Sequence, residues 1–321
     1  MDPRQHGSRL VIGTRGSPLA VIQAREARDR LAAALGWDKD RLTLSLVRTT
    51  GDAIQDRPLS EAGGKGLFTK ELDSALLAGA IDVAVHSAKD LPSFLPDGLI
   101  IAGYLPREDA RDAFVSSEAK SFSELPEGAV VGSASLRRQA MMRRLRPDLR
   151  VVLLRGNVGT RLGKVESGEI AATVLAVAGL KRLGLLDRAT AILAPDEFLP
   201  AVGQGAIALV TREADEPTRA AVAQISDQAT AVQLAAERAF LAVLDGSCRT
   251  PIAGHASLSG GRIAFRGLVL RPDGSEALAV TRAGEAGEAA RIGQEAGEEL
   301  RGRLPAGFLD PQDARPRHAP A

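Results

Sequence analysis

Residues 9–35 read RLVIGTRGSPLAVIQAREARDRLAAAL, and this stretch contains the pattern that decides the fold. The apolar residues at 9–13 predict a strand, and the amphipathic stretch at 18–35 predicts a helix directly after it. A strand that leads into a helix is the unit from which largely parallel sheets are built. The sequence therefore predicts an α/β protein.

The same alternation continues along the chain and occurs in two sections of similar make-up. In the first section we expect further strands at 42–48 and 81–86 and a helix at 67–78. In the second section we expect strands at 129–132, 151–154 and 171–177 and helices at 136–145 and 158–168. Two similar α/β domains follow, with crossings near residues 105–109 and 199–205, where Pro or Gly marks the chain.

The character of the sequence changes from residue 225 onward. Helices are expected at 230–244 and 285–304, and the turn at residues 271–274 predicts a hairpin between strands 263–270 and 277–282. These elements predict a small α+β domain. The end of the chain, residues 310–321, is rich in Pro, Ala and charge and is expected to be disordered.

Composition excludes several classes of protein. Charged residues make up 25% of the 321 residues and the net charge is +1, which gives no support to general attraction to nucleic acid or membranes. One cysteine, Cys248, excludes an internal disulfide, and no Cys or His cluster has metal-ligand spacing, so we expect no metal. The polar start and the short apolar run at 171–180 favour a cytoplasmic protein without a membrane span.

Two helix starts have the features of anion sites. Ser17 suits a helix N-cap, and the free N–H groups of that turn, together with Arg15, can bind a carboxylate or phosphate. Simple capping is the alternative. At the second start Ser135 precedes Arg137 and Arg138, although cations there oppose the helix dipole by about 0.3–1 kcal/mol each. A bound anion would remove that conflict.

Further arginines follow at strand ends and helix starts. Arg155, Arg161 and Arg182 extend the group, and arginine binds planar carboxylates through two parallel hydrogen bonds. The pattern predicts a ligand with several carboxylates or phosphates. An RNA-binding face is an alternative, although aromatic residues are only 3% of the chain. For the basic residues beyond the first turn of the helix, a solvated face is the simpler interpretation.

Two more segments carry candidate chemistry near the expected cleft. Lys89 and Asp90 follow the buried strand at 81–86, and ligands bind beyond the carboxyl ends of strands in α/β sheets. An aspartate beside cations stays ionised, accepts a proton and stabilises a cationic intermediate, whereas the alternative is a surface turn. Residues 63–68, GGKGLF, predict a flexible loop that brings Lys65 and Phe68 over the cleft.

Cys248 lies in a Gly/Ser loop after a helix and before Pro251. A single cysteine is usually an inert buried residue, but a loop of this composition favours access from solvent. Covalent attachment of a group is therefore an alternative to a structural role.

Several of these segments resemble the motifs of one family, the porphobilinogen deaminases. They occur in the order of that family and cover residues 9–282; they are residues 13–20, 63–68, 86–92, 106–112, 135–139, 155–157, 175–180, 199–205 and the Cys248 loop. The resemblance implies a transferase of haem, chlorophyll and corrin biosynthesis with a dipyrromethane cofactor joined to Cys248 by a thioether. Four porphobilinogen molecules are added in turn with loss of ammonia, and water then releases hydroxymethylbilane.

The resemblance also implies roles for individual residues. Asp90 matches the catalytic carboxylate, which helps ammonia leave and stabilises positive charge on the pyrrole nitrogens. Two sets of residues match positions that hold the acetate and propionate groups in the family. The set for the cofactor is Lys89, Ser135, Arg137, Arg138 and Arg155. The set for the substrate is Arg15, Ser17, Arg155, Arg161, Arg182 and Gln204. Lys65 and Phe68 match a mobile loop, and Glu61 stands where some members have lysine.

The family fold has two domains like periplasmic binding proteins, with mixed sheets around a cleft, and a small α+β domain that presents the cysteine. For this chain it implies a discontinuous first domain at 9–105 with 205–224, a second at 106–204, a third at 225–309 and a tail at 310–321. A monomer is expected, with hand-over of the product to uroporphyrinogen-III synthase.

Two other functions compete with this interpretation. A solute-binding protein on the same two-lobed architecture explains the arginines, but it does not explain Cys248 or the third domain. An RNA-binding protein would use the stretch from Arg137 to Arg161, and steep loss of RNA affinity with salt would support it.

Overall fold

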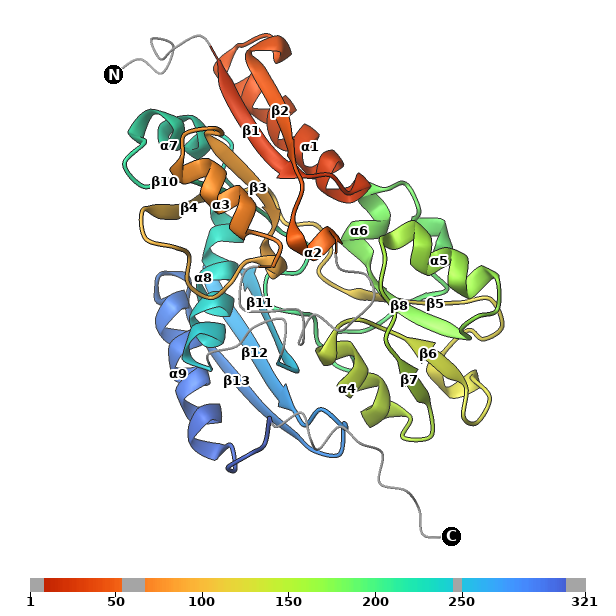
Figure 1. Cartoon of the computed structure of the whole chain (residues 1–321). Coiled ribbons are helices and arrows are strands. Elements are labelled where there is room, and N and C mark those ends of the chain that lie inside the picture. The colour runs from red at the N-terminus through yellow and green to blue at the C-terminus, as the bar shows by residue number, and fades with distance from the viewer. Residues whose placement is uncertain (1–8, 54–66, 245–249, 310–321) are drawn as a thin grey trace.

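The computed structural model describes residues 9–53, 67–244 and 250–309, which form two α/β lobes and a third domain (Figure 1). Each lobe contains a five-stranded mixed sheet, and the third domain contains a three-stranded antiparallel sheet. The expectation of two α/β domains with mixed sheets and a small α+β domain is confirmed.

The first lobe is built on a sheet with the order β2-β1-β3-β10-β4. Its strands are β1 (Leu10–Arg15), β2 (Leu42–Val47), β3 (Val83–Ser87), β4 (Leu99–Tyr104) and β10 (Ile207–Arg212). Strand β1 is parallel to β2 and β3, whereas β10 runs antiparallel to β3 and β4. The chain therefore returns to the first sheet after it has built the second.

The second lobe repeats this arrangement with the order β7-β6-β8-β5-β9. Its strands are β5 (Asp112–Ser116), β6 (Val130–Gly132), β7 (Arg150–Val152), β8 (Ala172–Ala176) and β9 (Ala191–Ile192). Here β6 is parallel to β7 and β8, and β5 is antiparallel to β8 and β9. The two sheets are thus mixed rather than largely parallel, because β10 and β5 enter them from the crossings.

Helices cover the sheets of both lobes. The first lobe has α1 (Pro18–Leu35), α2 (Thr50–Ala53), α3 (Lys70–Leu77) and α7 (Glu216–Ala223); the second has α4 (Leu136–Leu145), α5 (Val158–Glu166) and α6 (Val177–Arg182). Short 3-10 turns connect them: η2 (Lys39–Arg41), η3 (Ala88–Asp90), η4 (Phe122–Glu124) and η5 (Leu186–Arg188).

Helix α1 shows how the local sequence sets these boundaries. Ser17 caps its start by accepting a hydrogen bond from the Ala20 N–H, and Pro18 occupies the first turn, where its missing N–H costs no hydrogen bond. The helix ends at Gly36, which adopts φ 64°, a left-handed conformation that glycine tolerates. The helix expected at 18–35 is therefore confirmed at both ends.

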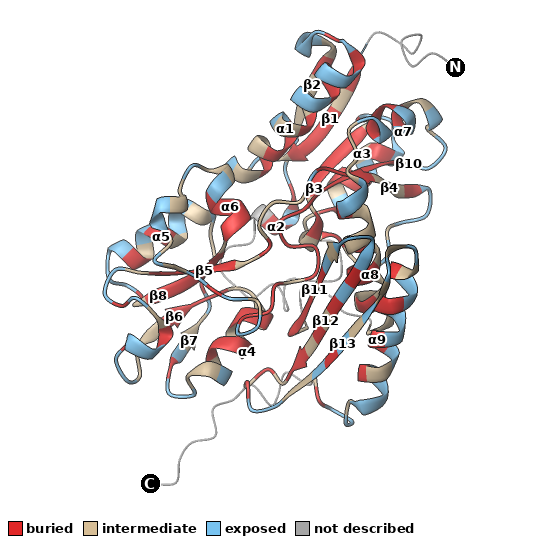
Figure 2. Ribbon diagram, turned by 180° about the vertical axis from the view of Figure 1, so that it is seen from behind, coloured by how far each residue is buried: buried red, intermediate tan, exposed pale blue. Residues whose placement is uncertain are grey.

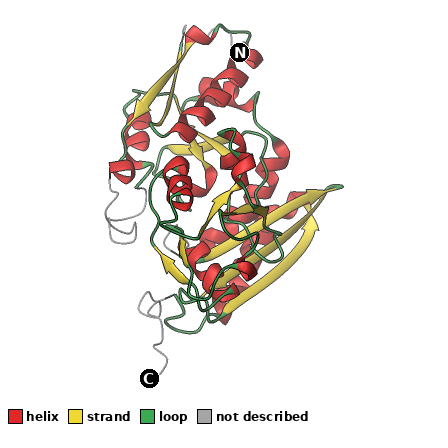
Figure 3. Ribbon diagram, turned by 90° about the vertical axis from the view of Figure 1, so that its right-hand side faces the viewer, coloured by secondary structure: helices red, strands yellow, loops and turns green. Residues whose placement is uncertain are grey.

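The third domain packs two helices on one antiparallel sheet (Figure 3). It contains α8 (Gln228–Val243), β11 (Ile252–Ser259), β12 (Arg262–Leu270), β13 (Ala277–Glu285), the short turn η6 (Ala286–Glu288) and α9 (Ala289–Arg303). The expected hairpin is confirmed, and β12 pairs with β13 from Arg262 to Leu270. The helix expected from residue 285 begins later, because β13 continues to Glu285 and η6 follows it.

Buried side chains join the third domain to both lobes. Figure 2 marks the buried residues of the strands and helices in red. Leu234 of α8 belongs to a core cluster of the first lobe, and Leu270 of β12 belongs to a core cluster of the second. The strands show which sheet each segment joins, whereas the precise domain boundaries stay a prediction. The tail at 310–321 lies outside the described residues.

Candidate functional site

The turn η3 follows β3 and bears Lys89 and Asp90. Its first residue, Ala88, donates its backbone N–H to the Ala206 carbonyl at 2.9 Å. Gly203, with φ 72°, packs so closely against this turn that a Cβ there would lie 3.0 Å from the backbone nitrogen of Lys89. The crossing between the lobes therefore lies directly against the turn, and a side chain at residue 203 would displace it.

Asp90 lies beside Arg15, which ends β1. The Asp90 Oδ2 and Arg15 Nη1 are 3.7 Å apart, and the Asp90 side chain retains 33% of its exposure. The Arg15 guanidinium also lies over the Phe68 ring, 4.1 Å from its centroid. These contacts bring three of the predicted residues together and leave the Asp90 carboxylate accessible to a ligand.

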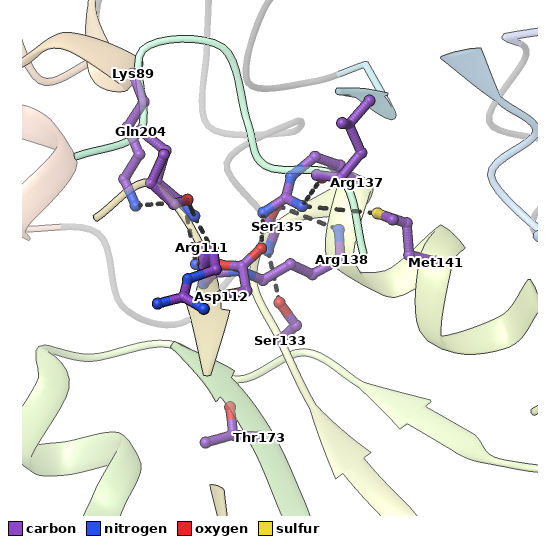
Figure 4. Close-up of polar contacts among 12 residues, drawn as sticks. Lys89, Arg111, Asp112, Ser133, Ser135, Arg137, Arg138, Met141, Thr173 and Gln204 are labelled. Atoms are coloured by element: carbon purple, nitrogen blue, oxygen red, sulfur yellow. Dashed lines mark hydrogen bonds and ion pairs between the residues drawn. The ribbon is translucent and has the colours of Figure 1, made fainter. Parts of the chain in front are cut away.

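A second group surrounds Asp112, the fully buried first residue of β5 (Figure 4). Arg137 Nη2 donates to Asp112 Oδ2 at 2.7 Å, and Arg138 Nη2 donates to Oδ1 at 2.6 Å. Burial alone would raise the pKa of Asp112, but the two guanidinium groups together lower it to about 2. Both arginines are therefore buried and already paired with a carboxylate.

Gln204 connects this buried group to the turn of the first lobe (Figure 4). Its Oε1 accepts hydrogen bonds from Lys89 Nζ and Arg138 Nη2, each at 3.3 Å. Its Nε2 donates to the Ala110 carbonyl at 2.7 Å and to Asp112 Oδ1 at 2.9 Å. One buried amide in the crossing segment therefore links Lys89 of the first lobe with Arg138 of the second.

Lys89 and Arg161 are in a different electrostatic situation. Burial, with a smaller contribution from Arg138, lowers the pKa of Lys89 to about 8 against the opposing charge of Asp90. Burial, followed by Arg138 and Arg155, lowers the pKa of Arg161 to about 10, again opposed by Asp90. Among the carboxylates of the described residues, none forms an ion pair with either cation. The positive charge here exceeds the negative charge, which suits an anionic ligand.

The remaining helix-start residues mostly serve the fold in this structure. Ser135 caps α4, as Ser17 caps α1, by accepting a hydrogen bond from the Arg138 N–H at 3.4 Å. Arg161 Nε donates to the Gly156 carbonyl at 3.0 Å, and Arg155 is partly buried in the loop between β7 and α5. The capping expected for both serines is present, and their contact with a ligand stays a prediction.

Arg182 connects the lobes, and its contact with a ligand stays a prediction. Its Nε lies 3.4 Å from Glu26 Oε2 on α1, and its Nη2 donates to the Gly205 carbonyl at 3.2 Å. The predicted residues Lys65 and Cys248, and also Glu61, lie outside the described residues. Their contacts with the site therefore stay predictions.

Sequence reasoning missed the partners that fix these residues. Asp112 closes the quoted motif at 106–112, but Glu108 and Asp109 lie in the same motif, so nothing local singles out Asp112 as the partner. Arg107 forms a buried ion pair with Glu237 of α8, with Nη1 and Oε1 2.6 Å apart. Glu237 Oε2 also accepts the Gly203 N–H at 2.7 Å. No local sequence pattern predicts this ion pair, because Arg107 and Glu237 lie 130 residues apart in the chain.

Other candidate sites lie away from this group. A cavity of about 250 Å³ lies between α4 and the sheet of the third domain, and none of the predicted residues lines it. In the part of the chain that the structure describes, no cluster of His, Cys, Asp and Glu could hold a metal ion. Within the same residues, no helix combines the length and apolar character that a membrane crossing requires.

Fold and site together define the chain as a two-lobed α/β protein with a cationic centre where the lobes meet. The family model "Porphobilinogen deaminase, dipyromethane cofactor binding domain" matches residues 10–220, and "Porphobilinogen deaminase, C-terminal domain" matches residues 231–302. The chain belongs to the porphobilinogen deaminase family. It is thus a member of a family of transferases of tetrapyrrole biosynthesis, whose larger domain binds dipyrromethane, as the sequence motifs indicated.

Two porphobilinogen deaminases agree with this assignment. The chain is 60% identical over 292 residues to porphobilinogen deaminase of Nitrobacter hamburgensis, covering 91% of this chain and 92% of that protein. It is 57% identical to that of Paracoccus denitrificans, covering 93% and 96%. A putative methionine-binding lipoprotein of Bacillus subtilis is 14% identical with a TM-score of 0.41, covering 70% of this chain and 92% of that structure.

Proposed function

We propose that this chain condenses four porphobilinogen molecules into a linear tetrapyrrole, releasing one ammonia per addition, and then hydrolyses the product free as hydroxymethylbilane. The observation that carries the proposal is the accessible Asp90 carboxylate beside Arg15, with the cations Lys89 and Arg161 nearby. Membership of the deaminase family supports the assignment of this group to that reaction.

The residues of the site fit a dipyrromethane with its acidic side chains. Lys89 and Arg161 supply positive charge that forms no ion pair with a described carboxylate, and both pKa values would rise towards ordinary values beside a bound anion. In this proposal Lys89, Ser135, Arg155 and the Arg137–Arg138 pair hold the cofactor, and Cys248 anchors it by a thioether. When bound, the cofactor supplies the pyrrole carbon to which the first substrate unit is joined.

Arg137 and Arg138 act mainly through charge and position in this proposal. Both side chains are buried, and Asp112 already accepts hydrogen bonds from each of them. One carboxylate between two guanidinium groups leaves a net charge of about +1 for the trio. After burial, Arg138 is the next contributor to the lowered pKa values of both Lys89 and Arg161. The group of Asp112, Arg137 and Arg138 therefore attracts an anion while its internal hydrogen bonds stay intact.

Asp90 performs the chemical work of the chain. Its carboxylate accepts a hydrogen bond from the pyrrole N–H of the incoming unit and stabilises the positive charge that develops as ammonia leaves. Arg15, whose Nη1 lies 3.7 Å from Asp90 Oδ2, helps to orient the carboxylate. Porphobilinogen carries an acetate and a propionate, for which Arg15, Ser17, Arg155, Arg161, Arg182 and Gln204 are the proposed partners.

Growth of the chain needs room between the lobes. The contacts of Arg182 with Glu26 and with the Gly205 carbonyl join the lobes and would have to change as units are added. The loop that contains Lys65 and Phe68 is the proposed cover over the growing chain, with Phe68 against Arg15. We further propose a cytoplasmic monomer with the domain boundaries given above, which hands its product to uroporphyrinogen-III synthase.

The test is the consumption of porphobilinogen by the purified full-length protein. The expected result is one ammonia released per porphobilinogen consumed, with hydroxymethylbilane as product. Cys248→Ser should show neither, whereas the neighbouring Ser247→Ala should behave like the parent. Reversible binding of porphobilinogen without ammonia release would instead support a solute-binding protein and would contradict the proposal.

A further inference from the structure

Helix α8 of the third domain runs along the first lobe beside the turn of Asp90. Its Leu234 is fully buried and belongs to the same core cluster as Ala88 and Leu91, the two residues that flank Lys89 and Asp90. Helix α8 also contacts β4, and the Asp227 N–H at its start donates to the Tyr104 carbonyl at 2.8 Å. Helix α8 therefore packs against the same core cluster that holds both ends of the Asp90 turn.

One turn after Leu234, Arg238 lies on the same face of α8. Its Nη2 donates to the carbonyls of Pro92 and Ser93, each at 3.0 Å. These carbonyls belong to the segment between η3 and β4, which contains neither helix nor strand. Backbone carbonyls in such a segment need donors from elsewhere, and a guanidinium supplies two bonds from one rigid group.

The two ends of the Asp90 turn are thus fixed differently. On the N-terminal side, β3 pairs with β1 and β10, and the Ala88 N–H donates to Ala206. On the C-terminal side the backbone leaves the sheet, and Arg238 contacts it two and three residues beyond Asp90. The Arg238 guanidinium is partly buried, and burial lowers its pKa. Water is therefore a poor substitute for these two bonds.

We infer that Arg238 is a positioning residue for Asp90, because its bonds to the Pro92 and Ser93 carbonyls hold the Asp90 turn against helix α8. This inference rests on the proposed function for its kinetic consequence. Loss of the bonds would let the turn shift relative to Arg15, and small misplacements of a reacting group slow chemistry more than they weaken binding.

The kinetic experiment compares Arg238→Gln with Arg143→Gln in the full-length, cofactor-loaded protein. Arg143 is the matched control, because its Nη1 donates to the Pro272 carbonyl at 2.9 Å and so also joins a lobe to the third domain, away from Asp90. We expect Arg238→Gln to lower kcat about tenfold with KM within about twofold of the parent. Arg143→Gln should keep the parental kcat.

Arg238→Lys retains the charge and should give a kcat between those of Arg238→Gln and the parent. If Arg238→Gln does not fold, Arg238→Lys decides alone: a reduced kcat supports the inference and a parental kcat overturns it. A parental kcat in a folded Arg238→Gln, or a raised KM with unchanged kcat, also overturns it, since a merely structural contact predicts no selective loss of turnover.

Amide hydrogen exchange provides a readout that does not depend on activity. Amides of residues 88–98 should exchange faster in Arg238→Gln than in the parent or in Arg143→Gln, and unchanged exchange there overturns the inference. A parent protein that releases no ammonia would refute the proposed function alone, because the exchange comparison would still decide the role of Arg238.

Discussion

Arg137 and Arg138 form ion pairs with a carboxylate, whereas Lys89 and Arg161 form none with the described residues. The two pairs are nevertheless close enough for Arg138 to lower the pKa values of Lys89 and Arg161. The first pair shares the buried Asp112, at 2.7 and 2.6 Å, and so belongs to a framework in which each guanidinium is already paired with a carboxylate. The second pair has only an amide and a backbone carbonyl as hydrogen-bond partners among the described residues. Burial without a counter-charge costs free energy unless a ligand supplies the charge.

The comparison teaches that a basic residue at a helix start does not reveal its own role. All four cations occur at strand ends or helix starts in the sequence. Asp112 distinguishes the two pairs of cations. It follows a crossing segment between the lobes and accepts hydrogen bonds from the guanidinium groups of the first pair only. We therefore expect substitutions in the first pair to reduce stability and substitutions in the second pair to weaken substrate binding.

The largest expected effect is at Asp90, the carboxylate that lies beside Arg15 and interacts electrostatically with Lys89 and Arg161. Asp90→Asn keeps the size but removes the charge, so turnover should fall by about 100-fold or more while the fold stays intact. Asp90→Glu should also lose most turnover, because the carboxylate moves by one methylene. Ammonia release and thermal unfolding measure the two properties, and the exposed Asp97→Asn in the same segment is the control. Near-normal turnover in Asp90→Asn would mean that another group does the chemistry.

The next effect breaks the paired framework of Asp112, Arg137 and Arg138. Asp112→Asn leaves two buried guanidinium groups without their carboxylate and should lower the free energy of unfolding by about 3–5 kcal/mol. Folding lowers the pKa of Asp112 from 3.8 to about 2, so its stabilising contribution is complete above pH 3.8 and is lost as pH falls through 2. Denaturant unfolding of parent and variant from pH 7 to pH 2 measures both, and equal stability at pH 7 would contradict the comparison.

Arg161 tests the ligand-facing pair. Arg161→Gln should raise KM about tenfold, because a charge-assisted bond to a substrate carboxylate is lost, while stability changes little. Lys164→Gln on the same helix removes an exposed ion pair with Glu169 and should leave KM unchanged. If Arg161→Gln instead destabilised the protein strongly and left KM intact, Arg161 would belong with Arg137 and Arg138.

The smallest effect is a pH dependence that arises from Lys89. Because its pKa is lowered from 10.5 to about 8, Lys89 opposes folding below pH 8, and this cost disappears as pH rises from 8 to 10.5. In the cofactor-free Cys248→Ser protein the free energy of unfolding should therefore rise between pH 8 and 10.5, whereas the cofactor carboxylates should raise the Lys89 pKa and flatten this rise in the loaded parent. Lys89→Gln in the Cys248→Ser background should lose the rise, and a rise that persists there would show that Lys89 is not the titrating group.

Much of the local structure follows from the sequence, because caps and periodicity are local. The helix at residues 18–35 begins at a Ser-Pro pair and ends at Gly36, and both signals are visible in the sequence. The turn that bears Lys89 and Asp90 follows a continuous apolar strand, as expected. Motif order was enough to indicate the family, which the comparisons confirm.

The unpredicted part depends on contacts between residues far apart in the chain. Strand β10 joins the first sheet between β3 and β4, although the whole second lobe separates it from them in sequence. Gln204 contacts Lys89 and Asp112, which lie 115 and 92 residues away along the chain. Composition and spacing contain no record of these partners, so the pairing of Arg137 and Arg138 with Asp112 could not be foreseen.

The intact mass of the purified full-length protein tests most directly whether the ligand-facing cations serve an acidic pyrrole chain fixed to this polypeptide. The parent should be heavier than its sequence by the mass of one dipyrromethane, and Cys248→Ser prepared in parallel should have the mass of the bare chain. A parent produced together with porphobilinogen that carries no added mass at Cys248 would contradict the account.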